Sequence, residues 1–291
     1  MRIIVTIKQV LDPAGFTVHR RLERVFINQE NYIINPNDEN ALETALQLKD
    51  AHGAEVVVLS LGEPRVDDAL REALALGADQ AFLLTDEAFA EADAAVAALV
   101  LGKAIEKIGG YDLILTGQRA LDTGASQIGP RLAEYLGLPQ VLEVREVSSF
   151  SRSRIPSRGG SHAAGSRAWE PALLQNRDLL SLSNGKLRAK RNWKDGYAEV
   201  EVSLPALFSI APQANQPRYP HGARIMSAYR EWKVAAWDLA DLGLTEEELN
   251  PLIGLQRKAF PPERTLGELI TGAPDEAAKE LAQLLRDNSF F

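Results

Sequence analysis

Alternation of short β-branched runs with longer helical patterns constrains this chain most. The runs at 3–7 and 55–61 indicate buried strands, and between them apolar residues recur at helical spacing from Asp38 to Asp50. A parallel pair of strands cannot be closed by a tight turn, so this alternation implies parallel strands joined by right-handed crossovers. The pattern predicts an α/β fold of Rossmann-like type, with an open, mainly parallel sheet and helices on both faces.

The same alternation continues to about Gln140. Ligands of such sheets bind beyond the carboxyl ends of the strands, so the loops after Ile7, Leu61 and Thr116 are the candidates for a site. Four further elements are expected in this region, a helix, a strand, a helix and a strand in that order: 64–77, 81–84, 89–108 and 112–116.

Two changes of composition suggest the domain organisation. We expect residues 1–212 to form the α/β nucleotide-binding domain, which closes with a hairpin or edge pair over 187–202 and a strand over 204–210. Segment 148–167 is rich in Ser, Arg and Gly and lacks acidic residues, so it is expected to be a mobile insertion, either a basic docking arm or a solvated loop. Residues 213–291 are expected to form an extended arm that ends in a helix from Pro274 to about Arg286 and packs on its own domain or on a partner subunit.

Composition excludes several classes of protein. The net charge of −8 argues against a protein that coats nucleic acid or an anionic membrane. The absence of cysteine excludes disulfides, thiolate catalysis and cysteine-held metal clusters within this chain, so redox work needs an organic cofactor. Because the first residues begin a strand pattern and no apolar run reaches the roughly 18 residues of a membrane span, we expect an intracellular, cytoplasmic protein.

The stretch from Gly117 to Glu134 is the most informative for chemistry. It starts where a strand ends and leads into a helix, and the small residues 123–126 would let a phosphate approach the N–H groups of the first helical turn. An ordinary loop with a helix cap at Asp122 or Thr123 is the alternative. The stretch lacks the lysine of a P-loop, and no G-x-G-x-x-G follows the first strand.

A second candidate is the loop 34–39, which leads into the first long helix. Asn35 could bind a base edge or a ribose, and Asp38 could hold a hydroxyl or cap the helix. The four histidines are scattered, so neither hydrolytic nor metal chemistry is indicated, and no catalytic residue is assigned within this chain.

Several motifs together resemble the small (beta) subunit of electron transfer flavoproteins. The similarity spans nearly the whole chain and is carried by the following segments: Val5-Thr6-Ile7-Lys8-Gln9-Val10 with Asp12, Asn35-Pro36 with Asp38-Glu39, 74–79, 117–129, Leu204-Pro205-Ala206, and Pro217-Arg218-Tyr219 with Ile225-Met226.

This resemblance implies a heterodimer with a larger alpha subunit that carries the electron-transferring FAD, and a dehydrogenase or quinone-reductase-type redox partner. The small subunit's own pocket would hold a second FAD in the electron-bifurcating branch, which oxidises NADH only in complex with partners, or a structural AMP in the housekeeping branch. By resemblance the pocket is lined by Thr6, Asn35, Pro36, Asn37, Asp38, Leu61, Gly117, Gln118, Asp122, Thr123, Gly124, Ala125, Ser126, Gln127 and Ile128.

Particular positions resemble the bifurcating branch, so FAD is the favoured nucleotide. These are Lys8-Gln9-Val10, the pair Gly129-Pro130 and the long tail, whereas the loop 122–125 lacks an acid and a hydroxyl common in the family. Gly222 stands where the housekeeping branch has a leucine anchor for its dehydrogenases. A stand-alone adenine-nucleotide-binding module and a purely structural subunit with an empty pocket are the alternatives.

Overall fold

The computed structural model describes residues 1–148, 185–194, 196–253 and 269–288. The chain forms two compact units, one made of residues 1–18 and 25–254 and the other of residues 19–24 and 255–291. The first unit carries the sheet and the candidate site. The expected insertion at 148–167 lies outside the described residues except for its first position.

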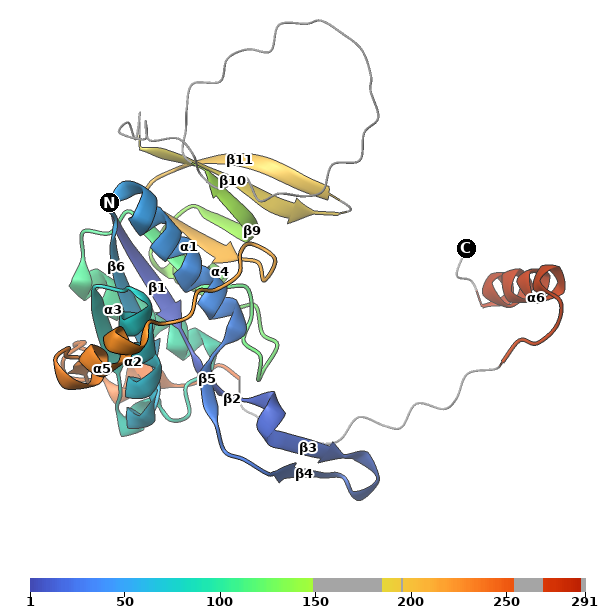
Figure 1. Cartoon of the computed structure of the whole chain (residues 1–291), viewed down its shortest axis with the longest axis horizontal. Coiled ribbons are helices and arrows are strands. Elements are labelled where there is room, and N and C mark those ends of the chain that lie inside the picture. Colours follow the sequence, from blue (N-terminus) through green and yellow to red (C-terminus); the bar gives the residue numbers. More distant parts are fainter. Residues whose placement is uncertain (149–184, 195, 254–268, 289–291) are drawn as a thin grey trace, which may run out of the picture. The chain divides into compact units, whose positions relative to one another are not determined.

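A mainly parallel sheet is the frame of the first unit (Figure 1). Within the described residues it has nine strands in the order β11-β10-β9-β12-β8-β1-β6-β7-β13. Neighbours from β9 to β13 pair in parallel, while β9, β10 and β11 pair in antiparallel fashion. The α/β prediction is therefore confirmed. The strand bounds are β1 (Arg2–Ile7), β6 (Glu55–Leu61), β7 (Gln80–Leu84), β8 (Leu113–Gly117), β9 (Gln140–Ser148), β10 (Lys186–Trp193), β11 (Gly196–Ser203), β12 (Ala206–Ile210) and β13 (Ala235–Trp237).

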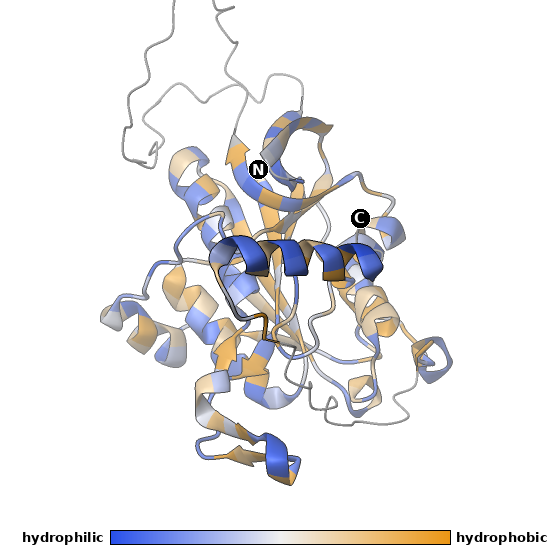
Figure 2. Ribbon diagram, turned by 90° about the vertical axis from the view of Figure 1, so that its right-hand side faces the viewer, coloured by the Kyte–Doolittle hydropathy of each residue, from blue (hydrophilic) through white to orange (hydrophobic). Residues whose placement is uncertain are grey.

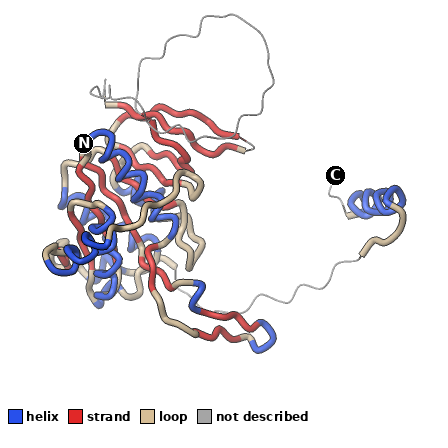
Figure 3. Tube along the Cα trace, in the orientation of Figure 1, coloured by secondary structure: helices blue, strands red, loops and turns tan. Residues whose placement is uncertain are grey.

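Helices cover both faces of this sheet, and their alternation with the parallel strands is visible in Figure 3. Residues Ile3 and Val5 of β1 belong to a core shared with α1 (Pro36–His52) and α2 (Asp67–Leu76). Ile4, on the opposite face, belongs to a core shared with α3 (Ala94–Ile108) and α4 (Ile128–Tyr135). Both faces are apolar because both are buried, and the middle strands are coloured largely as hydrophobic in Figure 2.

Local signals in the sequence set the helix ends. Pro36 occupies the first turn of α1, and Gly53 ends the helix in the left-handed conformation at φ 65°. The expected helix over 89–108 begins only at Ala94, because the side chain of Asp93 caps it by accepting from the N–H groups of Ala95 and Val96. A short 3-10 turn over Glu87–Phe89 precedes it.

Two small antiparallel ribbons follow β1 and were not expected from the sequence. One pairs β2 (Gln9–Leu11) with β5 (Tyr32–Ile34), and the other pairs β3 (Phe16–His19) with β4 (Arg24–Ile27). The β2–β5 ribbon brings the start of α1 back beside the end of β1, which positions the candidate site.

The first unit continues past the boundary expected near Pro212. β13 adds a parallel edge next to β7, and Trp237 packs against Phe82 with ring centroids 4.5 Å apart. Helix α5 (Gly222–Arg230) lies on α2, where Arg224 donates hydrogen bonds to the carbonyls of Leu74 and Ala75. An unpaired edge strand and the last carbonyls of a helix both need partners, and residues 222–237 supply them.

The second unit contains helix α6 (Pro274–Asp287), close to the helix expected from Pro274 to about Arg286. None of its residues is buried, and Leu281 is half exposed. The remainder of the C-terminal segment from 254 to 268 lies outside the described residues.

Candidate functional site

Three hydroxyl side chains lie in one row across the carboxyl ends of three neighbouring strands. Thr6 of β1 is in register with Thr116 of β8, which is in register with Ser209 of β12. Alternation along the strands places all three on the same face as Ile4 and Ile114, toward α3 and α4. All three are buried, so the sheet has a polar row at the carboxyl ends of its strands, where α/β folds bind their ligands.

The first turn of α4 lies against this row. A Cβ added at Gly129 would be 3.0 Å from the Thr116 hydroxyl oxygen, so the helix lies close enough that a larger residue would need its neighbours to shift by a few tenths of an ångström. No side chain caps the helix at Gln127, and its first turn, all of it described, holds no acidic residue. Pro130 has no N–H and the N–H of Arg131 donates to the carbonyl of Gln127, so the N–H groups of Ile128 and Gly129 and the positive end of the helix dipole are those available to an anionic ligand.

The loop between β8 and α4 folds into a compact turn. The N–H of Gly124 donates to the carbonyl of Ala120 at 2.8 Å, and Gly124 has a φ of 65°, which glycine adopts without strain. The hydroxyl of Thr123 accepts a hydrogen bond from the N–H of Ala125. Asp122 forms an ion pair with Lys8, which immediately follows β1. This ion pair connects the loop to the residue that follows the carboxyl end of β1.

The beginning of α1 holds the other side of the loop. The side-chain amide of Asn35 donates to the carbonyl of Arg119 at 2.9 Å and accepts from the N–H of Leu121 at 3.0 Å. The carboxylate of Asp38 accepts hydrogen bonds from the N–H groups of Lys8 and Gly117. Both side chains thus bind backbone groups at the exits of β1 and β8.

Burial raises the pKa of the Asp38 carboxyl to about 7. The N–H of Lys8, the amide of Asn35 and the N–H of Gly117 oppose this rise because they stabilise the carboxylate form. Asp38 is therefore a buried acid that changes its charge near neutral pH.

Two buried polar atoms at this edge lack a hydrogen-bond partner among the described residues: the Thr116 hydroxyl and the side-chain carbonyl oxygen of Asn37. Thr116 is 2% exposed and Asn37 is 8% exposed. Nearly all buried polar groups in proteins are hydrogen-bonded, so a pair of unsatisfied ones beside a helix N-terminus fits a site for a polar, anionic ligand such as a nucleotide.

The structure brings most of the predicted site residues to this edge. The start of α1 and the loop after β8 meet at Gly117, and Thr6 lies in the adjacent strand, whereas Leu61 ends β6 one strand further along the sheet. The N–H of Gln118 is taken up by the carbonyl of Ile210 at 3.0 Å. Along the loop, Asp122, Thr123, Gly124, Ser126 and Gln127 are exposed, and Ala125 and Ile128 are partly buried.

The predicted pocket lining did not include Thr116, Ser209, Lys8 or Gly129, although Lys8 and Gly129 stand in segments that carry the family resemblance. The hydroxyls sit at the ends of otherwise apolar strand runs, Leu113-Ile114-Leu115-Thr116 and Leu207-Phe208-Ser209, and that position was an available signal. Which strands are neighbours, however, follows only from the three-dimensional order of the sheet.

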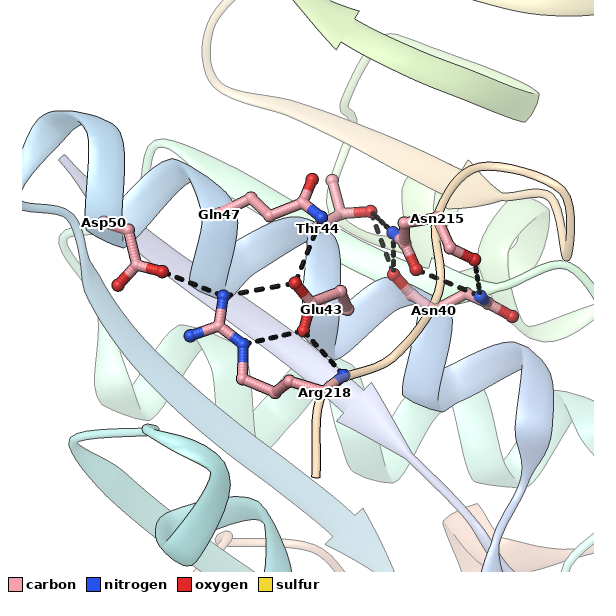
Figure 4. Close-up of polar contacts among 7 residues, drawn as sticks. All are labelled: Asn40, Glu43, Thr44, Gln47, Asp50, Asn215 and Arg218. Atoms are coloured by element: carbon pink, nitrogen blue, oxygen red, sulfur yellow. Dashed lines mark hydrogen bonds and ion pairs between the residues drawn. The ribbon is translucent and has the colours of Figure 1, made fainter. Parts of the chain in front are cut away.

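A second polar network fixes the segment after β12 along α1 (Figure 4). Glu43, buried on α1, accepts hydrogen bonds from the guanidinium of Arg218 at 2.8 and 3.1 Å, and Asp50 accepts another at 2.8 Å. Asn40 and Asn215 exchange hydrogen bonds one turn earlier, at 2.9 to 3.0 Å. This network holds the chain on its way to α5 and has no part in the sheet edge.

Other features of the described residues bear on whether alternative sites exist. They contain no group of His, Asp or Glu suited to hold a metal ion. One cavity of about 290 Å³ lies between α2, α5 and β5, and a groove of about 400 Å³ lies between α3 and α4. In the described part of the chain, no helix is both long enough and apolar enough to cross a membrane.

Comparisons with known proteins identify similar sequences. The profile of the electron transfer flavoprotein domain matches residues 24–159. The chain is 35% identical to the electron transfer flavoprotein subunit beta of Thermoanaerobacterium thermosaccharolyticum over 98% of both chains. It is 33% identical to subunit CarD of the caffeyl-CoA reductase-Etf complex of Acetobacterium woodii, covering 99% of this chain and 98% of the relative. Protein FixA of Bradyrhizobium diazoefficiens is 32% identical, with 100% of this chain and 91% of the relative covered.

Proposed function

This chain belongs to the electron transfer flavoprotein family, among the relatives of its beta subunits, and on that premise we propose that it binds FAD and relays electrons with an alpha subunit. The nucleotide would lie at the carboxyl ends of β1 and β8, between the start of α1 and the start of α4. We propose that the complex works in the cytoplasm with a dehydrogenase or quinone-reductase-type partner.

The observation that carries the nucleotide site is the buried Thr116 hydroxyl that has no partner among the described residues. Leaving a buried hydroxyl unsatisfied costs about 1–3 kcal/mol, so its retention is explained if a ligand completes its hydrogen bonding. Its place beside the first turn of α4 fits a phosphate or ribose oxygen.

The chain's own residues would bind and orient the nucleotide. The first turn of α4 supplies N–H groups and the helix dipole, and the glycine at 124 leaves the loop backbone open, with no atom within 4 Å of where a Cβ would stand. Asn37 and Thr116 offer buried hydrogen-bonding atoms that have no partner among the described residues. When bound, a flavin supplies the electron-carrying chemistry, while the protein fixes its position and electrostatic surroundings.

Within this family we favour the branch that carries FAD in the small subunit and takes hydride from NADH. Lys8-Gln9-Val10 and Gly129-Pro130 support it by their resemblance to that branch. A structural AMP in the same pocket is the alternative, since the loop 122–125 lacks an acid and a hydroxyl common in the family. We propose further that the C-terminal segment with α6 packs on the alpha subunit, because α6 buries none of its own residues.

The test is the nucleotide content of the protein copurified with its large subunit. Denaturing release followed by chromatography and absorbance should give two FAD per heterodimer. One FAD and one AMP would replace the bifurcating assignment by a single-flavin carrier. An intact complex that releases no flavin would overturn the electron-transfer role.

A further inference from the structure

We propose that Asn35 and Asp38 are positioning residues, which hold the loop 117–124 in the shape that receives the nucleotide and do not contact the nucleotide themselves. This inference rests on the proposed function, because it assigns roles within the same site. It distinguishes residues that hold the site in shape from residues that contact the ligand.

The side chain of Asn35 is hydrogen-bonded to the backbone of the loop after β8. Its side-chain amide donates a hydrogen bond to the carbonyl of Arg119 and accepts one from the N–H of Leu121, two positions further along the loop. Asn35 is 1% exposed. Between Arg119 and Leu121, the carbonyl of Ala120 accepts a hydrogen bond from the N–H of Gly124, and this bond closes the turn. A side chain that binds both sides of Ala120 therefore sets the direction in which the turn projects.

Asp38 joins the exits of two parallel strands. One carboxylate oxygen accepts from the N–H of Lys8 at 2.8 Å, just beyond β1, and the other accepts from the N–H of Gly117 at 3.1 Å, at the end of β8. The approach is so close that a Cβ at Gly117 would lie 2.2 Å from the carboxylate oxygen. Each oxygen is bound to a backbone N–H and only 8% of the residue is exposed, so the carboxylate is engaged with the protein's own backbone and little of it faces solvent.

Asn37 differs from Asn35 and Asp38, because its side-chain oxygen is not used in the hydrogen bonds that the described residues make. It lies between the two positioning residues in sequence, but its side-chain oxygen is buried and has no hydrogen-bond partner among the described residues. Asn35 and Asp38 thus complete the protein's own hydrogen bonding, while Asn37 and Thr116 remain to be completed by a ligand.

Burial of Asp38, which raises the pKa of its carboxyl, makes its hold on the loop depend on pH, and charged groups lie around it. β1 brings Lys8, whose charge favours the carboxylate, the loop brings Asp122, which Lys8 contacts, and α1 itself carries Glu39. A carboxylate accepts both N–H groups, whereas a protonated carboxyl keeps one good acceptor oxygen. Protonation should therefore loosen the exit of β8 and speed release of the nucleotide.

The experiment uses the heterodimer, with hydrogen exchange of the loop amides 117–125 and the rate of nucleotide release as two readouts. Asn35→Ala should speed loop exchange in the nucleotide-free protein and release the nucleotide about tenfold faster, as expected for lost hydrogen bonds. Asn35→Asp keeps the acceptor for Leu121 but turns a carboxylate oxygen toward the Arg119 carbonyl, so this buried, repelling pair should speed loop exchange at least as much as Asn35→Ala does. Thermal unfolding of each variant checks that it is folded.

Asn37→Ala is the matched control. It should weaken nucleotide retention without changing loop exchange in the nucleotide-free protein. In wild type, release should be faster at about pH 6 than at about pH 8, and Asp38→Asn should remove this difference. That pH readout separates positioning through the carboxylate from a general loss of stability.

Three results would overturn the proposal. Faster release from Asn35→Ala with unchanged loop exchange would make Asn35 a direct ligand contact, and faster exchange with unchanged release would show that the loop's shape does not matter. A pH dependence that persists in Asp38→Asn would exclude the carboxylate. If the wild-type complex carries no nucleotide, the proposed function fails. Loop exchange in Asn35→Ala then still tests whether Asn35 holds the loop 117–124.

Discussion

The carboxylate of Asp38 accepts a hydrogen bond from the backbone N–H of Gly117, 3.1 Å away, although these residues are 79 positions apart in the chain. A buried acid thereby joins the start of α1 to the end of β8. Because its charge sits in a region from which water is excluded, the ionisation of Asp38 should be visible in the stability of the whole protein.

Burial raises the pKa of Asp38 to about 7, well above the value of an unfolded aspartate. Between about pH 4 and pH 7 the folded state thus holds a proton that the unfolded state has lost, so this group's contribution to the free energy of unfolding falls as pH rises. The slope is at most about 1.4 kcal/mol per pH unit. Asp38→Asn should remove it, and urea unfolding across this range measures the difference. Parallel pH curves for variant and wild type would contradict the assignment.

Gly117→Ala should damage both fold and site. Its Cβ would lie 2.2 Å from the Asp38 carboxylate and 2.7 Å from the backbone carbon of Asn37, so the start of α1 must shift. We expect a loss of about 2 kcal/mol or more in the free energy of unfolding and reduced nucleotide content. Gly222→Ala, where no atom lies within 4 Å of the added Cβ, should stay within about 0.5 kcal/mol of wild type. Equal effects of the two substitutions would contradict the close approach.

Thr116→Val should separate binding from stability. The change keeps the shape of the side chain and removes a buried hydroxyl that has no partner among the described residues, so the nucleotide-free protein should be equally stable or slightly more stable. Nucleotide content after purification should nevertheless fall. In the control Thr44→Val, the lost hydroxyl bonds Asn40 and Asn215, so stability should fall by about 1 kcal/mol while nucleotide content is kept. Full nucleotide content in Thr116→Val would remove the hydroxyl from the site.

Arg218→Ala should destabilise the protein without a direct effect on the site. It leaves the Glu43 carboxylate buried and without its guanidinium partner, at a cost of about 2–3 kcal/mol, given that Arg218 is itself about one-third exposed. Adding Glu43→Gln should restore a large part of the loss, since a neutral amide is easier to bury. Chemical denaturation of both single variants and the double variant measures the coupling. Additive losses would show that the pair does not interact.

Strand and helix order was predictable for the first half of the chain because each element is long and its apolar spacing is regular. Strand 55–61 and the helix after it follow directly from that spacing. The ribbons β2–β5 and β3–β4 were missed because their strands have only three or four residues, and those of β3 and β4 are mostly exposed. Strand β13 was missed for a similar reason, since Ala235–Trp237 becomes a strand only by pairing with β7.

The candidate site was predictable to the level of its loops, because the carboxyl ends of parallel strands bind ligands. Which residues of the site bond to the protein's own backbone and which have unpartnered atoms could not be predicted. Asn35 and Asn37 are chemically identical and two positions apart, yet one is bonded to the loop backbone and the other has an unpartnered oxygen. That difference arises from where the loop after β8 passes, which depends on contacts more than 80 residues apart in sequence.

Strand β13 also has a consequence for how this chain can be shortened. A protein ending near Pro212 would retain every strand that carries the candidate site, but it would expose the backbone of β7 as a free edge and uncover Phe82, which Trp237 now shields. Open edges of this kind recruit strands from other molecules. Strand β13 thus protects the edge of β7 from pairing with other molecules, and a minimal nucleotide-binding fragment should extend at least through Trp237 to remain free of aggregation.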